Sequence, residues 1–321
     1  MNRRQYLIRT GAGVATATAL AGCLSDLTGS DSNVTVTDRT GDRALARAVG
    51  ALNEAALTLV VTDDVDEPSD LEFDPAEPTT RIEDGRAHLE TAATELDDDR
   101  EADVDVLRTY ADVLERLVAV TDTVADETLA DDAEDAFEAV DGDGDLEDAS
   151  TTVTERTAAL ERAQSRHDGA REDVDDFDDR FEELVRIDRT RLEDAVAELG
   201  DVLSPLVALG DALETLLDGY ESLENGQELL EEEKYDAARD EFDAAESSFE
   251  AATATLDAIE DPPSDLVDTI QATRCRSTHL ATAASAFDDA AAAGADGDTL
   301  SVSESRQEAN RALEDARNCS Q

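Results

Sequence analysis

The sequence is short of basic residues. It has 26 Lys+Arg against 82 Asp+Glu, which gives a formal net charge of -56, and Lys234 is its only lysine. Because so few cations cannot neutralise a row of phosphates, the composition argues against a nucleic-acid partner. Aromatic residues make up only 3% of the chain, and strong charge with few aromatics is also typical of disordered chains. Leu, Val and Ala nevertheless recur at helical spacing, which favours a folded domain.

The motifs of common catalytic and cofactor sites are also missing. The sequence has no nucleophile elbow, no phosphate-binding glycine loop and no HExxH pair. Of the three histidines, His88 and His167 lie in charged helical contexts and are predicted to be surface residues rather than acid-base catalysts. Carboxylates are so abundant that chance pairs are expected everywhere, so none is nominated as a general acid or base. We therefore expect no enzyme and no cofactor.

What the chain has in excess is acid, spread along its whole length. Self-repulsion on this scale opposes compaction in dilute buffer, and molar salt relieves it by shrinking the Debye length to about 3 Å. With arginine as nearly the only cation, the pattern resembles proteins of salt-in halophiles, haloarchaea above all. A binder of cations or basic proteins is the rival interpretation. The uniform distribution favours solvation of the whole surface over one acidic site.

The N-terminus has the layout of an export signal. Arg3 and Arg4 precede an aromatic-aliphatic pair and a weakly apolar stretch over 11–21, which resembles a twin-arginine signal. That stretch is shorter than the roughly 20 apolar residues that a membrane-spanning helix needs. The Leu-Ala-Gly-Cys sequence that ends at Cys23 resembles the lipobox of bacterial and archaeal lipoproteins. The resemblance implies a signal peptide over 1–22, cleavage before Cys23 and a lipid on its sulfur.

The segment after Cys23 is predicted to be a flexible tether over 23–42. It is rich in Ser, Thr, Asp and Gly and has no apolar period. Asn33 begins a glycosylation sequon within the tether, and Asn318 begins another near the far end. We therefore expect a protein on the extracytoplasmic face of the cell membrane, with membrane lipid as a partner through Cys23.

Hydrophobic periodicity predicts an all-α fold. Strand signals are almost absent, whereas apolar residues recur three and four positions apart. Long helices joined by short polar loops favour a multi-helix antiparallel bundle or a helical-repeat-like array after the disordered tether. We expect an N-terminal helical part over 43–140 and a C-terminal bundle over 146–321. The stripes that carry this prediction cover 45–59, 82–96, 104–124, 174–184 and 192–220.

Local signals predict where some helices begin and break. Thr80 is predicted to be an N-cap, with Glu83 completing a capping box. Ser204-Pro205 interrupts the stripe over 192–220, so a helix is expected to restart at Ser204 or to kink there. The residues from Val174 to Leu184 keep a period of four and three like that of a coiled coil.

One segment has small and aromatic residues at a fixed spacing: Gly226, Ala238, Phe242 and Ala245, together with Tyr235. This spacing resembles a tetratricopeptide repeat. In that family small residues let two helices approach closely, and the aromatic fills the groove between them. The resemblance implies a tight hairpin over 216–259 and, in a full repeat domain, protein binding on a concave surface.

The segment departs from that family at three positions. Ser222 and Asn225 replace large apolar residues, and Glu250 replaces a proline. No second copy lies 34 residues away in either direction. Because repeat arrays need about three units to bury their faces, a single match is also consistent with local helix packing alone.

An acidic loop and two cysteines are the remaining candidate sites. Asp141, Asp143 and Asp145 alternate as at the start of a calcium-binding EF-hand loop, but the glycine and glutamate that should follow are absent, so an acidic connector is favoured. Cys275 and Cys319 form a candidate disulfide in an oxidising compartment, with free buried thiols as the alternative. His279 lies one turn after Cys275, so the two side chains could supply two ligands to a metal ion. The sequence has no second pair of ligands to complete such a site.

These features lead to two hypotheses about function. The first is a non-catalytic, lipid-anchored cell-surface protein, in which a helical domain interacts with protein partners or supports the envelope. The alternative is an extracellular lipoprotein that binds a cation or small solute and serves a transporter.

Overall fold

The computed structural model describes residues 39–60, 73–126, 145–185, 187–264 and 266–320. These residues form nine α-helices and two short 3-10 helices, with no strand among them, so the predicted all-α fold is confirmed. None of the helices in the described ranges is both long and apolar enough to cross a membrane. The predicted signal peptide and most of the predicted tether lie outside the described residues.

The helices are long, and short connections join most of them. In chain order they are α1 (Thr40–Val60), α2 (Ala76–Glu95), η4 (Asp98–Arg100), α3 (Glu101–Val124), α5 (Leu146–Asp175), α6 (Asp179–Val185), α7 (Arg189–Glu231), α8 (Tyr235–Asp257), α9 (Val267–Ala295), α10 (Thr299–Arg317) and η5 (Asn318–Ser320). α1 begins at Thr40, inside the range predicted as tether, and Gly41 of its first turn packs against Leu96.

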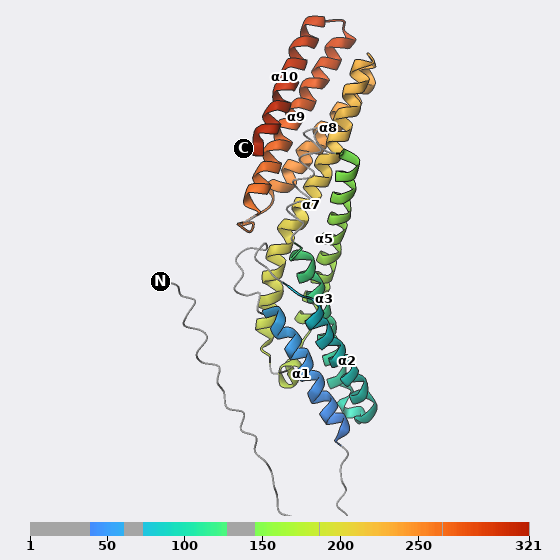
Figure 1. Ribbon diagram of the computed structural model, residues 1–321, viewed down its shortest axis with the longest axis vertical. Coiled ribbons are helices and arrows are strands. Elements are labelled where there is room, and N and C mark those ends of the chain that lie inside the picture. The colour runs from blue at the N-terminus through green and yellow to red at the C-terminus, as the bar shows by residue number, and fades with distance from the viewer. Residues whose placement is uncertain (1–38, 61–72, 127–144, 186, 265, 321) are drawn as a thin grey trace, which may run out of the picture. The chain divides into compact units, whose positions relative to one another are not determined.

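The long helices pack mainly against their neighbours in the sequence. α1 lies against α2, α3 against α5, and α5 against α7. The same order continues through α8, α9 and α10, as Figure 1 shows. Serial contact of this kind is typical of helical arrays, in which each element buries its apolar face against the next one along the chain.

α7 connects two hydrophobic clusters. Its first turns belong to a cluster with residues of α1, α2, α3, α5 and α6, whereas its second half belongs to a cluster formed mainly with α8, α9 and α10. Between them, Val120, Leu160 and Leu203 belong to a third cluster of α3, α5 and α7. Residues from both sides of the predicted boundary at 141–145 therefore belong to the same buried cluster. Positions 141–144 themselves lie outside the described residues.

Pro205 lies inside α7, so the helix does not restart at Ser204. The helix runs for 43 residues, and Pro205 is itself buried. Proline removes the hydrogen bond to the carbonyl four residues earlier, that of Asp201, at a typical cost of about 3 kcal/mol. Asp201 is exposed, where water can hydrate that carbonyl, and the buried Leu203 and Leu206 hold the flanking turns in the core.

The predicted continuous period from Val174 to Leu184 is broken by a turn. α5 ends at Asp175, and Phe177 lies between α5 and α6, with its carbonyl accepting a 2.6 Å hydrogen bond from Arg189. Phe177 stacks on Phe181 at a centroid distance of 4.1 Å. The turn keeps both rings in the core although the helix has ended, and periodicity alone could not show this.

α2 does not begin at the predicted Thr80 cap. α2 begins one turn earlier, at Ala76, whose N–H donates to the carboxylate of Asp74. Thr80 instead donates its hydroxyl to the carbonyl of Ala76 at 2.8 Å, inside the helix. Pro78 is tolerated in the first turn because the N–H that it lacks would have no helical partner there. The predicted capping box is therefore wrong.

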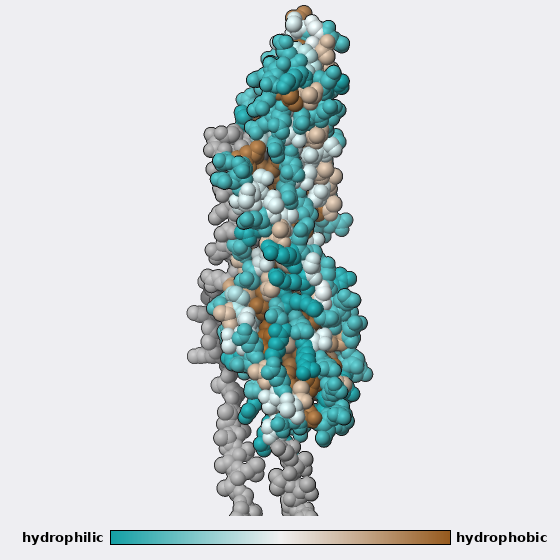
Figure 2. Space-filling view, turned by 90° about the vertical axis from the view of Figure 1, so that its right-hand side faces the viewer, coloured by the Kyte–Doolittle hydropathy of each residue, from teal (hydrophilic) through white to brown (hydrophobic). Residues whose placement is uncertain are grey.

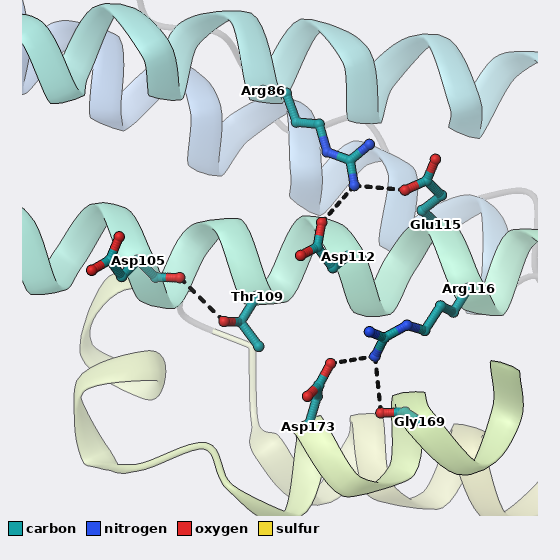
Figure 3. Close-up of polar contacts among 8 residues, drawn as sticks. All are labelled: Arg86, Asp105, Thr109, Asp112, Glu115, Arg116, Gly169 and Asp173. Atoms are coloured by element: carbon teal, nitrogen blue, oxygen red, sulfur yellow. Dashed lines mark hydrogen bonds and ion pairs between the residues drawn. The ribbon is translucent and has the colours of Figure 1, made fainter. Parts of the chain in front are cut away.

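Arginines bridge neighbouring helices. Arg86 of α2 reaches α3 and donates from one nitrogen to Asp112 and Glu115, both at 2.6 Å (Figure 3). Arg116 of α3 reaches α5, where it donates to the carbonyl of Gly169 at 3.0 Å and pairs with Asp173 (Figure 3). Each bridge neutralises carboxylates at the point where two helices meet.

A third bridge centres on a buried carboxylate. Asp103, at the start of α3, is 8% exposed and pairs with both Arg100 and Arg180. Arg100 also reaches Asp42 of α1 at 3.1 Å. A buried carboxylate is costly unless it is paired and hydrogen-bonded, and two guanidinium groups meet that requirement here.

We predict that Arg116→Gln lowers the free energy of unfolding by about 1 kcal/mol, because it removes a charge-assisted bond between α3 and α5 from a partly exposed site. Urea unfolding followed by circular dichroism measures this. Arg166→Gln on exposed α5 surface is the control, since it changes the net charge equally and has no ion pair in the described part of the chain. Equal effects of the two variants would contradict the bridge.

Candidate functional site

Several predicted site residues lie outside the described part of the chain. These are the lipidation candidate Cys23, the sequon residue Asn33, and the loop residues Asp141 and Asp143. Asp145 is described and caps α5, with its carboxylate accepting the N–H groups of Glu147 and Asp148 at 3.0 and 3.3 Å. The structure therefore gives Asp145 a helix-capping role.

The hairpin predicted over 216–259 is formed by the second half of α7 and by α8. Ala238, Phe242 and Ala245 are fully buried at the α7–α8 contact. Gly226 lies directly against the Phe242 ring, since a Cβ on Gly226 would be 2.6 Å from the nearest ring carbon. The first helix does not begin at residue 216 but continues from α7.

A second glycine and aromatic pair extends the same contact, and the sequence analysis missed it. Gly219 faces Phe249, where a Cβ would lie 2.8 Å from the ring. Both pairs are symmetric about Lys234 at the turn, as the register of an antiparallel hairpin requires. The signal was present in the sequence, because the two glycines and the two phenylalanines share a separation of seven residues.

The packing continues from α8 to α9 by the same means. Tyr235 lies against Gly294, where a Cβ would be 2.4 Å from its ring, and Phe242 stacks on Phe287 at 5.4 Å. Arg239 adds an ion pair to Asp288 at 2.8 Å. Three successive helices thus approach closely through small residues, aromatic rings and one cation.

Cys275 and Cys319 are joined by a disulfide that ties η5 to α9. Their Cα atoms are 5.8 Å apart, and the bond closes a loop with a sequence separation of 44. His279 completes a group whose potential ligand atoms all lie within 4.8 Å of one another, but both sulfurs are already engaged. Asn318, the second sequon residue, donates its side-chain amide to the carbonyl of Glu314 at 2.8 Å.

His167 is buried, so the prediction that it is a surface residue is wrong. It is 4% exposed in α5, and its Nε2 lies 2.8 Å from the carbonyl of Val196 in α7. Gly200 makes the space, because a Cβ there would be 2.9 Å from the imidazole. Sequence periodicity in α5 could not reveal a gap made by another helix. His88, the other predicted surface histidine, is partly buried.

The polar cavity beside His167 has a volume of about 430 Å³ and also contains Asp168 and Ser204 in its lining. Nε2 of His167 is held by the backbone carbonyl, and Nδ1 is 3.5 Å from Asp168. Nδ1 makes no hydrogen bond, and none joins Ser204 to the imidazole among the described residues, so the cavity does not show the Ser–His pair that a serine nucleophile needs.

The exposed faces of the helices are acidic, and two carboxylates on α7 have raised pKa values. Burial raises the pKa of Asp211, and the neighbouring Glu161 and Glu214 raise it further. Burial also raises the pKa of Glu224, beside Glu228 and Glu221. Figure 2 shows hydrophilic residues over most of the face that it draws, with small apolar patches between them.

No protein-family model, curated protein or solved structure matches this chain. The likeness of the α7–α8 hairpin to a tetratricopeptide repeat therefore rests on its own residues. Its best-supported chemical property is close, aromatic-filled helix packing beneath an acidic surface.

We predict that Gly226→Ala lowers the free energy of unfolding by about 1–3 kcal/mol, because the added methyl overlaps the buried Phe242 ring. Thermal unfolding measures the loss. Gly50→Ala in α1 is the matched control: no atom lies within 4 Å of its new Cβ, so helix propensity should raise stability by up to about 1 kcal/mol. Stabilisation by both variants would refute the close contact at Gly226.

Proposed function

We propose that this protein is a non-catalytic, lipid-anchored cell-surface protein, and that its helical domain serves as an interaction or structural scaffold. The observation that carries the proposal is the serial packing of α7, α8, α9 and α10, which creates a continuous framework with charged side chains outward. Proteins built in this way commonly act through extended surfaces rather than through enclosed catalytic centres.

Two features support an extracytoplasmic location. The arginine pair and the Leu-Ala-Gly-Cys sequence ending at Cys23 resemble the signal of an exported lipoprotein. The bond between Cys275 and Cys319 is of a kind that persists in oxidising compartments outside the cytoplasm. The partners that we propose are membrane lipid through Cys23 and other proteins at the cell surface, not nucleic acid.

We predict that Cys23→Ser moves the protein from the membrane fraction to the medium or the soluble fraction, because no lipid can then be attached. Fractionation with immunodetection measures the location, and mass spectrometry of the wild-type N-terminus tests for lipid on Cys23. Cys275→Ser is the control, since it removes a cysteine far from the signal and should leave the protein at the membrane. Membrane retention of the Cys23→Ser variant would rule out the anchor.

The proposed setting is the surface of a halophile. The acid surplus, the use of arginine to bridge helices and the crowded carboxylates around Asp211 and Glu224 all support a fold that functions in concentrated salt. A raised carboxyl pKa means that the ionised form opposes folding. That penalty is present at neutral pH and is relieved as pH falls through the raised pKa.

We predict that Asp211→Asn and Glu224→Gln each raise the melting temperature by about 1–2 °C in dilute buffer at neutral pH, with a smaller gain in molar KCl because salt screens the repulsion. The gain should shrink as pH falls through the raised pKa of each carboxyl, because the native group is then increasingly protonated. Asp240→Asn on the exposed face of α8 is the charge-matched control. A gain that is independent of salt and pH would contradict electrostatic crowding.

The second candidate function is a lipoprotein that binds a small solute for a transporter. An open pocket between α1, α3 and α7, lined largely by apolar residues, favours this candidate. Cation binding by the acidic loop is less favoured, since the carboxylate of Asp145, one of the three proposed ligands, accepts N–H groups of the first turn of α5.

A further inference from the structure

Two cysteines and a histidine come together where η5 meets α9. Cys275 and His279 are one turn apart on α9, so their side chains leave the same face of that helix. Cys319 comes from η5, and the potential ligand atoms of the three residues all lie within 4.8 Å of one another. No other group of this kind is found among the residues that the structure describes. We call these three residues the Cys–His cluster.

Helix packing brings Cys319 to the cluster, in addition to the disulfide. α9 and α10 lie side by side as a hairpin (Figure 1), with Ala309, Ala312 and Ala316 of α10 buried. η5 follows α10 directly and contacts α9. The two sulfurs are therefore held near each other even without the bond between them. Because every chain is made with free thiols, the cluster exists as two thiols and an imidazole before it is oxidised.

The reduced cluster has the donor atoms that zinc prefers. Thiolate sulfur binds Zn²⁺ at about 2.3 Å and imidazole nitrogen at about 2.0–2.1 Å, usually in tetrahedral geometry. Tetrahedral angles then place the ligand atoms about 3.5–3.8 Å from one another. Once the bond is absent, the Cα separation of 5.8 Å between the cysteines allows the sulfurs to reach that spacing by side-chain rotation.

The cluster is accessible, and its sulfurs distinguish it from the rest of the surface. All three side chains are partly buried rather than enclosed, so an ion from solvent can reach them. The chain has 82 Asp+Glu, whose carboxylates suit Mg²⁺ and Ca²⁺. Thiolates are soft ligands and select zinc over these ions. A chain that attracts many hard cations can therefore still hold zinc at this one place.

We propose that the reduced chain binds one Zn²⁺ through the thiolates of Cys275 and Cys319 and the imidazole of His279, with water in the fourth position, and that oxidation exchanges this ion for the disulfide. Both states fasten η5 to α9. The site goes beyond the proposed scaffold and does not involve lipid at Cys23. Only the order in time, zinc before disulfide, rests on the proposed export to an oxidising compartment.

The exchange balances with simple thiol chemistry. A dithiol reduces the Cys275–Cys319 bond, supplies two electrons and two protons, and becomes a disulfide itself. Zinc binding then releases both protons, because the metal binds thiolates. In the reverse direction a small-molecule disulfide takes two electrons from the two thiolates and two protons from solvent, and leaves as two thiols. The Cys275–Cys319 bond forms, and Zn²⁺ is released.

The test uses the full chain with Cys23→Ser, so that the cluster supplies the only two thiols, produced without export. The chain is reduced with a dithiol, freed of it under argon and titrated with Co²⁺ in molar KCl. We expect the absorption of tetrahedral Co²⁺ with a thiolate-to-metal charge-transfer band, saturating at one ion per chain and lost when Zn²⁺ is added. The oxidised chain is the matched control. Its carboxylates should give no such band, since oxygen ligands supply no thiolate.

His279→Ala should weaken zinc binding by at least about tenfold, because even the loss of a group that only supports a ligand costs 10-fold to 100-fold. His88→Ala, on α2 and outside the Cys–His cluster, should leave the affinity unchanged. Cys319→Ser should abolish the charge-transfer band. Circular dichroism verifies that each variant keeps its helicity.

Oxidation of the zinc-loaded chain with oxidised glutathione tests the exchange. We expect release of one zinc per chain to a chromogenic chelator, in step with the loss of both titratable thiols. The proposal is overturned if the reduced chain gives no thiolate–cobalt band, if His279→Ala binds zinc as tightly as its parent, or if zinc stays bound after the disulfide has formed. Because Cys23 is absent throughout, these results are independent of the test of the lipid anchor.

Discussion

The surplus of carboxylates is the constraint on which the rest of this structure depends. With 26 basic residues against 82 acidic ones, the chain cannot neutralise its surface pair by pair. Several of its arginines instead lie where helices meet, and two of these serve two carboxylates each: Arg86 bridges Asp112 and Glu115, and Arg100 bridges Asp42 and Asp103. Repulsion is thereby reduced at the contacts, while the outer faces remain acidic.

Inside the fold, small residues help to offset the repulsion between carboxylates at the surface. Where the surface opposes compaction, the helices gain most from close and extensive contact, which glycine and alanine permit. Gly226 against Phe242 and Gly219 against Phe249 bring α7 and α8 together over the length of the hairpin. The few aromatic residues are consequently concentrated at these contacts and around Tyr110, rather than spread over the chain.

Periodicity was sufficient to predict the all-α fold and the main helices, because a buried stripe leaves its spacing in the sequence. Periodicity failed where the position of a residue depends on another part of the fold. Pro205 remains in α7 because the core holds both flanking turns, and His167 is buried because Gly200 makes room for it. The nearness of Cys275 and Cys319 could be proposed from the sequence. The buried, unpartnered hydroxyl of Tyr110 could not, since it depends on how the surrounding helices pack.

The disulfide has a consequence for how the array comes apart. In a row of helices that contact mainly their neighbours, the last helix has a neighbour on one side only, so opening should begin at the ends. The bond from η5 to Cys275 fastens the far end of α10 to the first third of α9. The α9–α10 hairpin is thus held together by its turn at one end and by the disulfide at the other. Separation of α10 by fraying is blocked, and the C-terminal edge of the row behaves as a cap.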